Sequence, residues 1–314
     1  MRKRRLKKSV IRNGIVFLGF IFIIIGVVIF IKVSNYHKTN LYKLKQIGYS
    51  SDEINRILDE PIDNISYVLD NGYSENINKI LNEKYYLSKN FLRYINYMNS
   101  NGGVDLKNVI SLVNTNRDKE EYTDVMPADV DRKELVLVNK YYYLDKDYKP
   151  NDVSLISSWY AYADNYSSDV VMEEYKKMFN DASKAGLDLI ISSGFRDYKN
   201  QEETYNEYVR DYGEEYAKRY ASLPGYSEHQ TGLAFDILTT GVLTDDFEKT
   251  DEFKWLKDNC YKYGFILRYP KGKENITGYD YESWHYRYVG LDVARKIRDE
   301  GITFDEYYAY YIER

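Results

Sequence analysis

The residues of this chain best suited to chemistry are two histidines and two carboxylates near its C-terminus. The chain of 314 residues has only three histidines, and His229 lies in the segment SEHQTGLAFD, which ends at Asp236. His285 lies in the segment YESWHYR, three residues after Glu282. A catalytic zinc site uses three nitrogen or oxygen ligands and keeps a fourth position open. His229, Asp236 and His285 could therefore bind Zn²⁺, and Glu282 could act as a general base beside it.

Spacing alone leaves a second interpretation open. A continuous strand would direct residues 229 and 236 to opposite faces, because they are an odd number of positions apart. Gly232 permits a turn between them, after which Asp236 can face the same side as His229. A lone histidine at a strand end is commonly a buried structural residue, and the Glu-x-x-His pattern is weak by itself. The alternative is a hairpin that contains one buried polar residue.

The segments around these residues are predicted to mix strands and helices without regular alternation. The strand-like segments are 134–144, 187–196, 231–238, 265–270 and 283–290, and the helix-like segments are 169–186, 199–221, 252–264 and 292–311. This order predicts an α+β fold with a mainly antiparallel sheet flanked by helices. The single cysteine, Cys260, lies among apolar neighbours of a predicted helix and is expected to be a buried structural thiol.

The N-terminus predicts a membrane anchor. Residues 14–31, GIVFLGFIFIIIGVVIFI, carry no charge and are long enough to cross a bilayer as a helix. The preceding tail, MRKRRLKKSVIRN, is strongly basic, which predicts that it stays in the cytoplasm. The segment that follows offers no good cleavage site for a signal peptidase. We therefore expect a single-pass protein of the cell membrane that contacts lipid through residues 14–31 and has an extracellular C-terminal domain.

Two segments after the anchor repeat a pattern. IGYSSDEINRILD (47–59) and NGYSENINKILNE (71–83) each place serines before a short apolar periodicity, as expected for the N-caps of short helices. Such a helical repeat region could be a stalk or a module that binds the cell wall or a partner, and the sequence leaves both open. We expect three parts: a basic tail and anchor (1–33), a helical repeat or stalk region with a linker (34–125), and the domain that carries the chemistry (126–314).

Composition excludes some partners. The chain is 44% hydrophobic and 30% charged with a formal net charge of -5, a balance typical of a globular protein rather than one that binds nucleic acid. A single cysteine excludes a disulfide within the chain. Oligomeric state is not indicated by the sequence.

Four segments resemble the VanY-type D-alanyl-D-alanine carboxypeptidases, a family of zinc peptidases. SEHQTGLAFD matches the family's S-x-H-x-x-G-x-A-x-D motif, and YESWHYR matches E-x-W-H-[FY]-R. SSGFRDYKNQ resembles S-G-[FY]-R-S-x-x-x-Q, and LVNKYYYLDKDYKPNDV resembles the segment that opens the family's domain. The resemblance covers residues from about 134 to about 290 and does not extend to residues 1–125.

The resemblance implies a hedgehog/DD-peptidase-like fold for residues 126–314 and a set of site residues. Zn²⁺ is then bound by His229, Asp236 and His285, although ligands of this kind would also accept another divalent metal. Glu282 is implied as the general base and later proton donor, and Arg196 as the group that stabilises the oxyanion or steers the substrate carbonyl.

Residues implied to contact the substrate follow from the same motifs. Gln201 and Ser227 match positions near the terminal carboxylate of the substrate, and Trp284 is expected at the floor of the pocket or in the core. Asp197 departs from the family, which commonly has serine there, and it adds a negative charge beside Arg196. A surface ion pair between Arg196 and Asp197 or Glu202 is the alternative to a catalytic role.

The function implied is removal of a terminal D-alanine from peptidoglycan stem peptides. The motifs do not separate DD- from LD-carboxypeptidase activity, or cell-wall maturation from glycopeptide resistance. Two alternatives remain: a peptidoglycan endopeptidase of the same fold, and a zinc-holding cell-wall binding module without catalysis, as hedgehog domains keep this fold and its zinc. A module without catalysis could lose Glu282 and Arg196, and this sequence has both.

Overall fold

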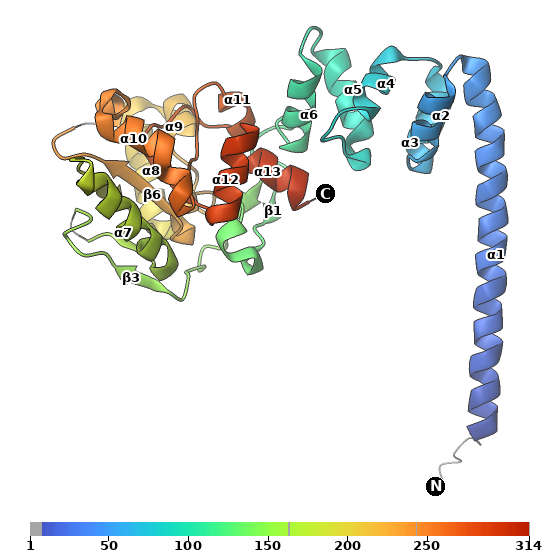
Figure 1. The fold of residues 1–314 in the computed structure, drawn as a ribbon, viewed down its shortest axis with the longest axis horizontal. Helices are drawn as coiled ribbons and strands as arrows, with labels where there is room; N and C mark the ends of the chain where they lie inside the picture. Colours follow the sequence, from blue (N-terminus) through green and yellow to red (C-terminus); the bar gives the residue numbers. More distant parts are fainter. Residues whose placement is uncertain (1–7, 163, 243, 314) are drawn as a thin grey trace. The chain divides into compact units, whose positions relative to one another are not determined.

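The computed structural model describes residues 8–162, 164–242 and 244–313 (Figure 1). By its internal packing the chain divides into two compact units, Met1–Asn96 and Tyr97–Arg314. The basic residues Arg2, Lys3, Arg4, Arg5 and Lys7, on which the predicted membrane orientation depends, lie outside the described residues.

Helix α1, Lys8–Ile47, contains the predicted anchor. Within the part of the chain that the structure describes, Leu18–Ile47 is long and apolar enough to cross a membrane, with a mean hydropathy of 2.4 in its most apolar window. An 18-residue helix is about 27 Å long, close to the thickness of the hydrocarbon core of a bilayer. The large apolar side chains of this stretch, such as Phe22 and Phe30, are exposed, as contact with lipid would require.

The two predicted repeat helices are confirmed as α2, Ser51–Leu58, and α4, Glu75–Leu81. Ser50 and Ser74 are their N-caps, and both side-chain oxygens accept hydrogen bonds from the backbone of the first turn. The isoleucines at matching positions of the two repeats are buried. The other elements described within residues 51–100 are α3 (Ile62–Asn71), η1 (Ser88–Asn90) and α5 (Phe91–Ser100).

The C-terminal unit mixes helices with small, mostly antiparallel sheets, as predicted. Its helices are α6 (Leu106–Asn114), α7 (Asp169–Lys184), α8 (Tyr198–Tyr212), α9 (Glu214–Tyr220), α10 (Asp251–Asn259), α11 (Glu274–Thr277), α12 (Leu291–Glu300) and α13 (Phe304–Tyr311). Its strands are β1 (Met126–Pro127), β2 (Tyr142–Tyr143), β3 (Val153–Leu155), β4 (Tyr166–Ser168), β5 (Ile190–Ser193), β6 (Ala234–Leu238), β7 (Phe265–Leu267) and β8 (His285–Tyr288). Its 3₁₀ segments are η2 (Val130–Leu135), η3 (Glu228–Thr231), η4 (Thr244–Lys249) and η5 (Cys260–Tyr263).

The main sheet has the strand order β5-β6-β8-β7, and every neighbouring pair in it is antiparallel. Alternation along β6 and β8 separates a core face from a polar face. Phe235 and Tyr286, which pair across the two strands, are fully buried in the main hydrophobic core together with residues of α7. Asp236 and His285 form the next pair in this register, so they lie on the opposite face of the sheet. The sheet thus has one face for the core and one for a polar site.

The predicted strand at 134–144 is wrong for most of its length. Residues up to Leu135 belong to η2, and only Tyr142–Tyr143 forms a strand, which pairs with β1. The side-chain oxygen of Asn139 accepts hydrogen bonds from the backbone N–H groups of Tyr141 and Tyr142. Because these N–H groups bond to the Asn139 side chain, they are not available for pairing with a neighbouring strand. Most apolar residues of the segment are nevertheless buried.

Two smaller features of the C-terminal unit bear on the predictions. Cys260 is buried as expected, and burial raises the pKa of its thiol to about 12. Helix α6 packs against α13, where the hydroxyl of Ser111 donates a 2.6 Å hydrogen bond to Glu306. Residues before the expected boundary at 125 therefore contact the C-terminal helices.

Gly232 ends η3 with a left-handed backbone, and it carries the turn that the sequence predicted (φ 69°). A Cβ at this position would lie 3.2 Å from the backbone nitrogen of Ser168, whereas Gly301, with a similar φ of 64°, has open space around it. Gly301→Ala should cost about 1–2 kcal/mol for the left-handed backbone conformation alone. Gly232→Ala should cost this amount and about 1–3 kcal/mol more for crowding. Thermal unfolding of the two variants measures the difference, and equal midpoints would contradict it.

Candidate metal centre

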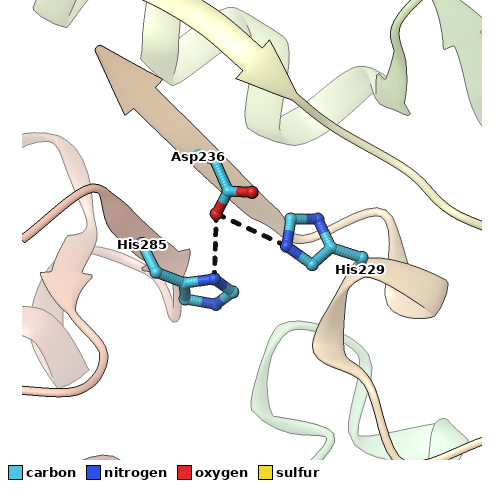
Figure 2. A group of neighbouring side chains, drawn as sticks. All are labelled: His229, Asp236 and His285. Atoms are coloured by element: carbon cyan, nitrogen blue, oxygen red, sulfur yellow. Dashed lines mark hydrogen bonds and ion pairs between the residues drawn. The ribbon is translucent and has the colours of Figure 1, made fainter. Parts of the chain in front are cut away.

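His229, Asp236 and His285 meet in one buried cluster (Figure 2). Asp236 lies between the two imidazoles: its Oδ1 is 3.1 Å from Nδ1 of His285 and 3.5 Å from Nε2 of His229. One ligand atom from each residue lies within 4.8 Å of the others. The chain therefore brings together the three residues that the sequence predicted as ligands.

Three elements position these side chains. Asp236 and His285 face one another because they are directly paired in the antiparallel register of β6 and β8. His229 comes from η3, where the Ser227 hydroxyl accepts a hydrogen bond from the backbone N–H of His229. The left-handed Gly232 then returns the chain into β6. The odd spacing between residues 229 and 236 is thus accommodated by a short 3₁₀ turn rather than by a continuous strand.

Hydrogen bonds orient the His229 ring. Its Nδ1 lies 2.7 Å from the carbonyl oxygen of Gly194, which can only accept, so Nδ1 carries the proton. Nε2 is then unprotonated and directed toward Asp236, the form in which imidazole binds a metal. Burial, followed by the charge of Arg196, lowers the pKa of His229 and keeps the ring neutral.

The donors fit a zinc ion. Two imidazole nitrogens and one carboxylate oxygen form one of the usual sets for catalytic zinc. Burial raises the pKa of Asp236, but the two neighbouring histidines outweigh that effect. The pKa of the carboxyl therefore lies well below its usual range, and the group is ionised. Burial disfavours protonation of His285, yet the nearby carboxylates of Asp236 and Glu228 raise its pKa to about 9. The cluster thus attracts positive charge, and a metal ion and a proton would compete for His285.

Glu282 lies beside the ligands. It is buried, and its Oε2 is 3.7 Å from Nδ1 of His285. Burial raises the pKa of Glu282 to about 8 despite the opposing charges of His285 and Arg196. A carboxyl with a pKa near neutrality can both take and give a proton during turnover. A cation bound by the neighbouring ligands would shift Glu282 toward its ionised, proton-accepting form.

The other predicted site residues line the same pocket as the ligands. These residues are Arg196, Gln201, Ser227 and Trp284. Gln201 is buried in α8, where its Nε2 donates to the carbonyl of Ser222, while its Oε1 has no hydrogen-bond partner among the residues that the structure describes. Arg196 follows β5, and its backbone N–H donates to the carbonyl of His229. Trp284 both lines the pocket and packs against the core, so the two alternatives for it coincide.

Asp197, the departure from the family motif, is exposed and caps α8. Its carboxylate accepts a 2.8 Å hydrogen bond from the backbone N–H of Asn200. This use of the side chain stabilises the start of the helix that carries Gln201.

Sequence reasoning missed two groups of residues around the centre. The first is a set of tyrosines in the pocket wall: Tyr208, Tyr220, Tyr269 and Tyr279. The second is Glu228 with Arg268 and Arg287, all fully buried against one another. A signal for the second group was present, since Arg287 shares a strand face with His285 and Glu228 directly precedes His229.

Comparison with known proteins agrees with this geometry. Residues 164–291 match the family model VanY, D-alanyl-D-alanine carboxypeptidase. The bifunctional D-Ala-D-Ala dipeptidase and D-Ala-D-Ala carboxypeptidase VanXYC of Enterococcus gallinarum is 33% identical over 181 residues, which are 56% of this chain and 94% of that protein. YodJ of Bacillus subtilis (strain 168) is 42% identical over 181 residues, 55% of this chain and 66% of YodJ. The match thus spans just under two thirds of YodJ.

Solved structures give the same assignment. The LD-carboxypeptidase LdcB superposes with a TM-score of 0.55 at 38% identity, over 61% of this chain and 92% of LdcB. A VanY D,D-pentapeptidase in complex with Zn(II) superposes with a TM-score of 0.50 at 33% identity, over 55% of this chain and 98% of that structure. Together with the ligand cluster, these matches show that the chain belongs to the VanY family of zinc-dependent D-alanyl-D-alanine carboxypeptidases.

Proposed function

We propose that this protein is a membrane-anchored zinc carboxypeptidase that removes the terminal D-alanine from peptidoglycan stem peptides outside the cell. The observation that carries the proposal is the cluster of His229, Asp236 and His285 with the buried carboxyl of Glu282 beside it. Relatives support this choice of substrate. VanYB has been solved in complex with D-alanine-D-alanine, and the structure of LdcB reveals the molecular basis of peptidoglycan recognition.

The residues can divide a hydrolysis between them. A zinc ion held by His229, Asp236 and His285 would supply positive charge that polarises the scissile carbonyl and acidifies water. Glu282 accepts a proton from the attacking water while the oxygen of that water bonds to the carbonyl carbon. Glu282 then returns this proton to the amine of the departing D-alanine as the C–N bond breaks. Arg196 in the same pocket stabilises the negative charge that develops on the carbonyl oxygen.

Recognition of the end of the peptide is assigned to the rest of the pocket wall. The Ser227 hydroxyl can donate to a terminal carboxylate, and the guanidinium of Arg196 adds positive charge. Gln201 lines the same wall, where its amide nitrogen has a second hydrogen to donate besides the one bonded to Ser222. Trp284 contributes an apolar surface to the same pocket. A subsite for a free terminal carboxylate would favour a carboxypeptidase over an endopeptidase, whose substrate continues past the cleaved bond.

Both DD- and LD-carboxypeptidases occur among the relatives, so the proposal covers both. A purely binding module is disfavoured, because Glu282 and Arg196 occupy the pocket together with the ligands.

The anchor and the repeats complete the proposal. Helix α1 would span the membrane through residues 14–31, with the basic tail in the cytoplasm and residues 34–314 outside. Residues 34–125 would act as a stalk for the catalytic domain, residues 126–314.

The ligand set predicts that zinc stabilises the fold. Full-length protein in detergent, stripped of metal with a chelator, should unfold at a lower temperature and recover when zinc is added. Zinc at about 100 times its dissociation constant should add about 2.7 kcal/mol. His285→Ala should lose this effect, whereas His37→Ala, which changes the third histidine of the sequence, should keep it. Equal zinc responses of both variants would contradict the assignment.

Glu282→Gln should retain zinc and lose activity, because the amide cannot accept the proton of the attacking water. We expect D-alanine release to fall by about 10²–10⁴-fold. Mass spectrometry of stem peptides ending in D-Ala-D-Ala, or in a diamino acid followed by D-Ala, measures the loss and separates DD- from LD-specificity. Substantial activity in Glu282→Gln would refute the mechanism, and internal cleavage by the unmodified protein would favour the endopeptidase.

The topology has its own test. A reporter enzyme that is active only outside the cytoplasm, fused after Arg314, should be active in cells. The matched fusion to a reporter that is active only in the cytoplasm should be silent. The opposite pattern would overturn the proposed orientation without affecting the assignment of the metal ligands.

A further inference from the structure

Nε2 of His285 faces away from Asp236 and toward a second buried carboxylate. It lies 3.7 Å from Oε2 of Glu228, and neither atom has a hydrogen-bond partner within the described residues. Both residues are almost fully buried, so water does not replace a missing partner cheaply. A potential donor and a potential acceptor thus face one another just beyond hydrogen-bond distance.

A buried pair of arginines fixes Glu228 in place. Its Oε1 is 2.8 Å from Nε of Arg268 and 2.9 Å from Nη1 of Arg287. Arg287 is itself held by the backbone carbonyls of Glu134 and Val136. Because both guanidiniums contact one oxygen of Glu228, the other oxygen is left to face His285.

The charges of this network balance without any charge on His285. Asp305, from α13, accepts hydrogen bonds from Arg268 at 2.6 and 3.2 Å and from Asn139 at 2.8 Å. Two carboxylates, Glu228 and Asp305, therefore face two guanidiniums. When a metal replaces the proton on Nδ1, the imidazole is neutral, and donation of its Nε2–H to Glu228 suits this balance.

We propose that Glu228 is a positioning residue that accepts the Nε2–H of His285 and so directs the unprotonated Nδ1 of that ring to the metal. The proposal rests on the metal centre described above. It gives His285 the same kind of support that the Gly194 carbonyl gives His229, at the opposite ring nitrogen. In this role Glu228 acts on the metal through the His285 ring and not as a fourth ligand.

Two substitutions separate positioning from simple stability. Glu228→Gln and Asp305→Asn each remove a buried carboxylate charge from the same arginine, Arg268, but only Glu228 faces His285. Zinc affinity of the full-length protein in detergent is measured by competition with a chromophoric chelator, and the thermal midpoint is measured without metal. Both variants should lose stability, whereas only Glu228→Gln should weaken zinc binding, by about 10–100-fold.

The outcomes distinguish this inference from the proposed function. Unchanged zinc affinity in Glu228→Gln, or an equal loss in Asp305→Asn, would overturn the positioning role while leaving the metal centre intact. No zinc binding by the unmodified protein would instead remove the metal centre itself, and the inference with it.

A second measurement does not depend on variants that fold. The chain has only three histidines, so ¹⁵N–¹H correlation spectra of the zinc-loaded protein can assign each ring tautomer. His285 should carry its proton on Nε2, and His229 on Nδ1. A proton on Nδ1 of His285 would contradict the proposal.

Discussion

The pairing of β6 with β8 places Asp236 opposite His285, and the rest of the site is arranged around this pair. The same register places Phe235 opposite Tyr286 on the other face, where both are fully buried. A slip of one residue would exchange the two faces, expose the aromatic side chains and separate the ligands. The hydrophobic core therefore fixes the register, and the register fixes the two ligands. His229 depends on the same strand, because the Gly232 turn leads directly into β6.

Buried charge is organised in two layers around this pair. The inner layer contains the ligands and Glu282. Burial raises the pKa of Glu282, whereas at Asp236 the neighbouring histidines outweigh burial and lower the pKa. The outer layer contains Glu228, and Arg268 and Arg287 hold the pKa of its carboxyl below the usual range despite burial. Such a network contributes little net stability, since desolvation of the charges offsets much of their attraction. Its value lies in fixing the orientation of groups that must meet one another.

Much of this arrangement could be predicted from the sequence. The rest depends on contacts between distant segments or on a local turn, which the sequence pattern did not indicate. The spacing of His229, Asp236, His285 and Glu282 left the metal site open, and the resemblance of their motifs to the VanY family made their proximity foreseeable. The helices were foreseeable as well, because their apolar periodicity and caps, such as Ser50 and Ser74, are local. The strand predicted at 134–144 was not formed, since the Asn139 side chain turns the backbone there. The partnership of Glu228 with Arg268 and Arg287 was missed, because the sequence shows only that Arg287 shares a strand face with His285. The ion pairs themselves join residues from three segments that the fold brings together.

The central claim is that His229, Asp236 and His285 bind one zinc ion. A crystal structure of the zinc-loaded protein, with anomalous scattering recorded on both sides of the zinc absorption edge, tests it most directly. We expect a single peak about 2.0–2.2 Å from Nε2 of His229, a carboxylate oxygen of Asp236 and Nδ1 of His285. A peak bound by other residues, or no peak at this cluster in zinc-loaded crystals, would contradict it.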